Sequence, residues 1–107
     1  MLANFITAYT APVAVALTAE CQVGDSVVIR PLDSITTGNT SNLTVTTVAK
    51  GGATGAAFIG ADKQSVIYVA STSGIGGSGG ATDTITYEIN DGINESSAAN
   101  IVITLIP

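Results

Sequence analysis

Acidic residues are the first candidates for chemistry in this sequence of 107 residues. Calcium takes about six to eight oxygen ligands in proteins, usually from several carboxylates. The acids that could supply them are Asp25, Asp33, Asp83, Asp91 and Glu95. They lack the Asp-x-Asp-x-Asp spacing that places ligands around one ion, and Asp91 is better explained as a turn residue whose carboxylate accepts backbone hydrogen bonds. We therefore predict no bound metal and no cofactor.

The remaining groups give no pattern for catalysis. Cys21 is the single cysteine, and the chain has no His that could activate its thiol, so we expect Cys21 to pack as a small, half-buried hydrophobic residue. The acids are too dispersed for the carboxylate pair of a glycosidase. Residues 74–80 are rich in Gly but lack the Lys and the following helix of a phosphate-binding loop. We predict that the protein is not an enzyme.

Charge and hydropathy exclude two classes of partner. The net charge is −5, and the three cations, Arg30, Lys50 and Lys63, are too far apart in sequence to predict the basic patch of a nucleic-acid-binding protein. Residues 1–19 have no basic start and no long apolar run, which argues against a signal peptide and a membrane span. Met1 indicates a complete small open reading frame or a residue left by cloning.

These side chains must be positioned by β-strands. Polar positions are filled mainly by Thr, Ser and Asn rather than by helix-favouring Glu, Lys and Gln, and apolar residues alternate with polar ones along most segments. Period 2 predicts strands, separated by turn residues, at 13–20, 26–31, 42–49, 56–60, 64–70, 82–90 and 98–106. The chain is therefore predicted to be all-β, an antiparallel β-sandwich of about seven strands.

The alternation also predicts which side chains face the core. Thr44, Thr46, Thr84, Thr86 and Thr104 should face solvent, and a bulge is expected near Val48, where the period slips. Tyr87 should hydrogen-bond to backbone near a turn, and Asp91-Gly92 should form a tight turn. The predicted core residues are Val27, Ile29, Leu43, Val45, Val66, Tyr68, Ile85, Tyr87, Ile89, Ile101, Ile103 and Leu105.

The first residues have no clear period. Residues 1–11 are predicted to form an N-terminal arm or an edge strand, and residues 12–107 the sandwich domain. An arm can reach a neighbouring molecule through apolar side chains. The candidate partner contacts are Leu2, Phe5, Ile6 and Tyr9.

The second half carries a family pattern. Residues 82–105 read TDTITYEINDGINESSAANIVITL, in which a D-T-I-T-Y segment is followed by D-G and a final alternating strand. This resembles the end of bacterial immunoglobulin-like or cadherin-like domains, and residues 11–14, 24–27 and 42–48 resemble earlier parts of them. The resemblance spans about residues 11–105 and implies an immunoglobulin-like sandwich. Family members often bind calcium through an Asp-rich loop, but the matching segment 33–40 has one acid.

The resemblance, together with the exclusions, implies a function in assembly. Domains of this kind occur on phage capsids and tails, so we expect a virion structural protein that decorates or cements a tailed-phage capsid. Its partner would be the lattice of the major capsid protein, and the resemblance suggests a homo-oligomer such as a trimer. The alternative is one repeat of a bacterial surface adhesin, located on the cell surface. A carbohydrate-binding module would need exposed aromatic residues, and the chain has no Trp.

Overall fold

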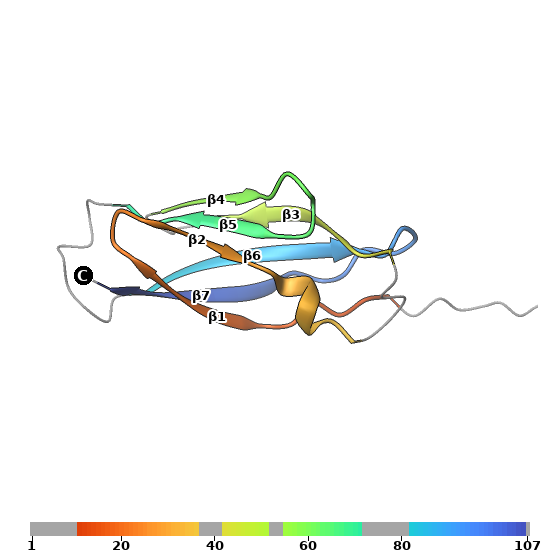
Figure 1. Cartoon of the computed structure of the whole chain (residues 1–107). Coiled ribbons are helices and arrows are strands. Elements are labelled where there is room, and N and C mark those ends of the chain that lie inside the picture. The colour runs from red at the N-terminus through yellow and green to blue at the C-terminus, as the bar shows by residue number, and fades with distance from the viewer. Residues whose placement is uncertain (1–10, 37–41, 52–54, 72–81, 107) are drawn as a thin grey trace, which may run out of the picture.

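The computed structural model describes residues 11–36, 42–51, 55–71 and 82–106 and shows two β-sheets packed face to face (Figure 1). The larger sheet has the order β1-β7-β6-β3, formed by Leu17–Gln22, Ala99–Ile106, Thr82–Asn90 and Thr44–Ala49. The smaller sheet has the order β2-β5-β4, formed by Ser26–Ile29, Val66–Val69 and Ala56–Ile59. The predicted all-β, immunoglobulin-like sandwich of seven strands is confirmed.

One strand pair departs from the antiparallel pattern. β1 runs parallel to β7, with Leu17 opposite Ile101 and Gln22 opposite Ile106. The other pairs of both sheets are antiparallel. The chain leaves β1 for β2 in the opposite sheet, so β1 has no hairpin partner and instead joins the free edge of β7. Alternation of side chains does not encode strand direction, which is why this pair was not predicted.

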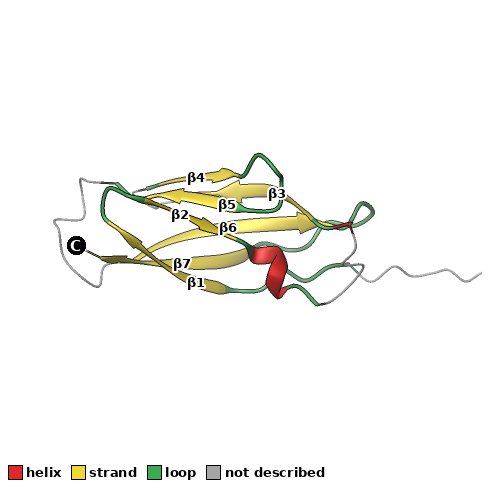
Figure 2. Cartoon of the chain, viewed as in Figure 1, coloured by secondary structure: helices red, strands yellow, loops and turns green. Residues whose placement is uncertain are grey.

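Two local features lie away from their predicted positions. The first strand begins at Leu17 rather than at residue 13, and the register of β3 against β6 shifts between Val45 and Thr47 rather than near Val48. In addition, Pro31–Ser34 forms one turn of 3-10 helix within the segment between β2 and β3 (Figure 2). Pro31 favours this turn because its ring fixes φ near the helical value.

The core lies between the two sheets. All of the predicted core residues except Val27 are buried, and Tyr68, Tyr87 and Ile85 have no exposed surface. Val27 is partly buried and packs against the core from β2, a short strand at the edge of its sheet. Among the described residues, the core also contains Ile35 and Ala70, which were not predicted, and Cys21, which is buried at 4% exposure rather than half-buried as expected.

Candidate functional surface

The outward faces of the two sheets differ in chemistry. In the larger sheet, outward positions of β6 carry Thr84, Thr86 and Glu88, as expected for a strand with one face in water. In the smaller sheet, the outward positions are apolar except for Ser26. Val28, Ile67 and Phe58 lie opposite one another across β2, β5 and β4 and form one continuous row.

The next outward row of the smaller sheet extends this surface. Ser26, Val69 and Ala56 lie opposite one another two residues along the same strands. Three of the apolar side chains are exposed, with exposed fractions of 59% for Val28, 54% for Phe58 and 38% for Val69, and Ile67 and Ala56 are partly buried. None of the six positions in the two rows carries a charge. The two rows together form what we call the apolar face.

The sequence contained a signal for the apolar face that alternation alone does not reveal. The segments VVI of β2 and VIYV of β5 are unbroken apolar runs. Such runs are typical of strands that are covered on both faces. In this domain the core covers only the inward face, so the outward side chains of the runs are left in water.

A buried acid fastens the smaller sheet to the larger one. Asp83 is 6% exposed, and its carboxylate accepts hydrogen bonds from the Tyr68 hydroxyl and from the backbone N–H of Gly55, at 3.0 Å for the latter. Burial, and then the hydrogen bond to Asp83, raise the pKa of Tyr68 far above its ordinary range, so the phenol remains a hydrogen-bond donor. Asp83 therefore links β6 to β5 and to the start of β4.

Gly55 makes this arrangement possible. A Cβ atom built on Gly55 would lie 2.5 Å from the Tyr68 hydroxyl oxygen and 2.5 Å from the carbonyl oxygen of Val69. Only glycine allows the chain to pass this close to Tyr68 and still donate its N–H to Asp83. The network holds the start of β4 in place and thereby positions one side of the apolar face.

Tyr87 ties the N-terminal part of the domain to the core. Its hydroxyl donates to the carbonyl oxygen of Val15 at 2.6 Å and accepts from the Val15 N–H at 2.9 Å. Burial raises the pKa of the Tyr87 hydroxyl. The expected bond to backbone exists, but its partner lies 72 residues away in sequence rather than at a nearby turn. This contact also explains why Val15 lies outside β1, since its backbone groups bond to a side chain.

Asp91 organises the turn that follows β6. Its Oδ1 accepts hydrogen bonds from the N–H groups of Ile93 at 2.8 Å and Asn94 at 2.7 Å, and Gly92 adopts a φ of 95° that favours glycine. The hydrogen bonds from Asn94 and Ile93 lower the pKa of the Asp91 carboxyl. This is the geometry of an Asx turn.

The acidic residues do not converge on a metal. Asp25 caps the N–H of the following Ser26 at 2.8 Å, Asp33 lies 3.8 Å from Arg30, and Glu95 accepts from the Thr46 hydroxyl. Among the described residues, no group of three or more acidic, Cys or His side chains could hold a metal ion.

The other residues singled out in the sequence are Cys21, the N-terminal apolar residues and the Gly-rich segment. Cys21 is buried, and burial raises the pKa of its thiol, which keeps the sulfur protonated and unreactive. The candidate partner contacts Leu2, Phe5, Ile6 and Tyr9 and the Gly-rich residues 74–80 lie outside the described residues. No helix within the described ranges is long and apolar enough to cross a membrane.

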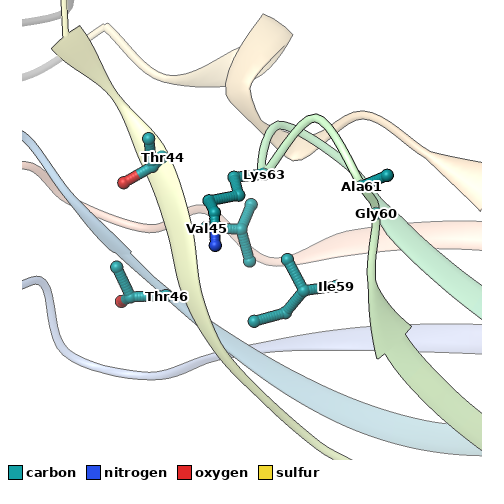
Figure 3. A pocket seen from close by; sticks show the side chains of 7 residues that line it. All are labelled: Thr44, Val45, Thr46, Ile59, Gly60, Ala61 and Lys63. Atoms are coloured by element: carbon teal, nitrogen blue, oxygen red, sulfur yellow. The ribbon is translucent and has the colours of Figure 1, made fainter.

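An open hollow of about 430 Å³ lies between β3 and the end of β4. Figure 3 shows Val45 and Ile59 facing the space between the two strands, with Lys63 extending from the β4–β5 turn toward β3. The turn is attached to β3 because the N–H of Val45 donates to the carbonyl oxygen of Lys63 at 2.8 Å. The hollow thus combines an apolar floor with one cation.

Comparison with known proteins agrees with this architecture. A sequence model of the family described as Bacterial Ig domain matches residues 9–104. The match covers the segments that resemble bacterial immunoglobulin-like domains, so that resemblance is confirmed. No curated protein matches the sequence.

Proposed function

Because the chain belongs to the bacterial Ig domain family, we propose that it is a structural module acting through protein–protein contacts, and that it decorates and cements a tailed-phage capsid. Domains of this family are generally non-enzymatic binding or structural modules. The observation that carries the proposal is the exposed, uncharged apolar face. The partner is the lattice of the major capsid protein, and the location is the outer surface of the virion.

The apolar face favours a protein partner over solvent. Contiguous exposed apolar surface is costly in water and commonly marks a contact site. Val28 and Phe58 are each more than half exposed, at 59% and 54%. Because the face carries no charge, a partner can cover it without desolvating an ion.

The size of the apolar face favours a repeated partner. Strands of four residues rise about 13 Å, and three strands span roughly 14 Å, so the footprint is on the order of 200 Å². A stable pairwise complex buries about 800 Å² per partner. One such contact is therefore weak, and several copies held together on a lattice would gain affinity from multivalency. Trimers at three-fold lattice positions would provide such multivalent binding, with added contacts from Leu2, Phe5, Ile6 and Tyr9.

The test is the copy number of the protein in virions. Phage particles from the source culture are purified by density, and the protein is quantified by mass spectrometry against the major capsid protein. We expect an amount on the order of one copy per capsid subunit. A few copies per particle would place the protein at the tail or a vertex and contradict decoration of the shell. Complete absence would overturn the virion function and favour the adhesin repeat on a bacterial surface.

A further inference from the structure

The hollow between β3 and β4 lies where both sheets end. β3 is the last strand of the larger sheet, and β4 is the last strand of the smaller one. Among the described residues, each therefore has one side without a neighbouring strand. The N–H and C=O groups on such a side can pair with an added chain. The turn at Lys63 bridges the two edges at one end, through its bond to Val45. At the other end the chain runs directly from β3, which ends at Ala49, to β4, which begins at Ala56.

The side chains that line the hollow differ in character. Val45 is 2% exposed and forms an apolar floor, and Ile59 is 37% exposed and forms one wall. Thr44 and Thr46 also line the hollow, from β3, and the hydroxyl of Thr46 is bonded to Glu95. The charged side chain among the lining residues is that of Lys63.

The acid next to Lys63 in the sequence is bonded to other groups. The neighbouring Asp62 is directed elsewhere: its carboxylate accepts from the N–H of Gln64 at 2.9 Å and from the Ser65 hydroxyl at 3.1 Å, and it lies 3.7 Å from Arg30. Arg30 also lies 3.8 Å from Asp33, so two acids near the turn are engaged with Arg30.

The backbone of Lys63 gives a second, independent indication. Its φ is 59°, in the left-handed region that Gly and Asn adopt most readily. A lysine at this position strains the backbone. Strain of this kind is concentrated at functional positions, which suggests that the side chain, rather than the turn, accounts for a lysine here.

We propose that this hollow binds an extended segment of a partner protein that carries a carboxylate. The main chain of the segment pairs with the open edge of β4, an apolar side chain packs on Val45 and Ile59, and the carboxylate meets Lys63. Strand addition of this kind draws affinity from main-chain hydrogen bonds and specificity from adjacent side chains. The chain has a net charge of −5, so an acidic segment is repelled from most of the surface and attracted to this position. The site is separate from the apolar face and does not depend on its function.

The test is an NMR titration of the full ¹⁵N-labelled chain with the synthetic peptide acetyl-Thr-Val-Glu-Val-Thr-amide. We expect amide shifts confined to β3, β4 and the turn at Lys63. The matched peptide with Gln in place of Glu should bind about three- to fivefold more weakly, as expected for the loss of one exposed charge pair. Equal affinity of the two peptides, shifts elsewhere, or no shifts up to the solubility limit would overturn the proposal.

Three variants, one of them a control, test the location of the binding site. Lys63→Asn keeps a residue that tolerates positive φ and removes the charge, so it should bind both peptides equally and weakly. Lys50→Asn, which changes the net charge by the same amount, should bind like the wild type. Ile59→Glu places a carboxylate in the hollow and should abolish binding. Unchanged peptide binding by Ile59→Glu would contradict the proposed location of the site in the hollow. Thermal melts of each variant exclude unfolding as the cause of any loss of binding.

Discussion

At the scale of single residues, the buried carboxylate of Asp83 holds three strands together. We expect Asp83→Ala to lower the free energy of unfolding by about 2–4 kcal/mol, because the Tyr68 hydroxyl and the Gly55 N–H would both lose a buried acceptor. Tyr68→Phe keeps the ring and removes one donor, so it should cost about 1–2 kcal/mol. Urea unfolding followed by circular dichroism measures both changes.

Thr84→Ala is the control for this network. Thr84 neighbours Asp83 on β6 but faces solvent, so its loss should cost less than about 1 kcal/mol. An Asp83→Ala effect no larger than that of Thr84→Ala would show that the buried network does not stabilise the fold.

Asp91 makes stability depend on pH. Hydrogen bonds from Asn94 and Ile93 hold the pKa of its carboxyl below the ordinary value of 3.8. A pKa that is lower in the folded state gives stability that is complete above the unfolded pKa and is lost as the pH falls through the folded one. Urea midpoints should therefore decline below about pH 4.

The variant Asp91→Asn isolates this contribution. It retains an acceptor oxygen for the turn but no longer titrates, so its urea midpoint should fall less steeply with decreasing pH than that of the wild type. Some decline should remain, since the pKa values of Asp62 and Glu95 are also lowered by hydrogen bonds. Identical pH profiles for the variant and the wild type would contradict the conclusion that Asp91 contributes to the pH dependence of stability.

At the scale of elements, the outward side chains of β4 should affect docking more than folding. Phe58→Glu replaces a side chain that is 54% exposed, so we expect a change in unfolding free energy within about 1 kcal/mol. Binding to capsids that lack the protein, measured by co-sedimentation, should fall at least about tenfold because a charge would be buried on docking. Thr84→Glu, on the polar outward face of β6, should bind capsids normally. An equal loss of capsid binding in both variants would exclude the apolar face as the docking surface.

Strand alternation predicted the core well and the long-range contacts poorly. The inward positions of β6 follow directly from period 2, and Ile85, Tyr87 and Ile89 are all buried. Asp83 lies on the same side of β6 as these three residues, so the alternation indicates that this acid is also buried. Its partners Tyr68 and Gly55 come from other strands, and only the packing of the two sheets brings them together. The same holds for the bond between Tyr87 and Val15.

The position of the apolar face could not be predicted from the pattern of apolar residues. The run VIYV in β5 is apolar at every position, so it predicts a strand but not which side is left uncovered. That assignment required the register, which places Ile67 between Val28 and Phe58. The direction of β1 against β7 likewise depends on topology rather than on side-chain type.

At the scale of the whole molecule, the domain and its N-terminal segment should separate in function. The described part of the sandwich is already anchored at its start, because Pro12 is buried and Val15 is bonded to Tyr87. Deletion of residues 1–10 should therefore shift the thermal midpoint by less than about 4 °C, the equivalent of roughly 1 kcal/mol. If Leu2, Phe5, Ile6 and Tyr9 contact the capsid lattice, the same deletion should abolish docking on capsids.

Two measurements on the deleted chain separate these effects. Calorimetry reports stability, and co-sedimentation with capsids reports docking. A quadruple change of Leu2, Phe5, Ile6 and Tyr9 to Ser keeps the segment length and should reproduce the loss of docking, since it removes apolar contact area. A large drop in thermal midpoint on deletion would instead make residues 1–10 an integral part of the sandwich. Unchanged docking by both variants would leave the apolar face as the surface that holds the domain on the lattice.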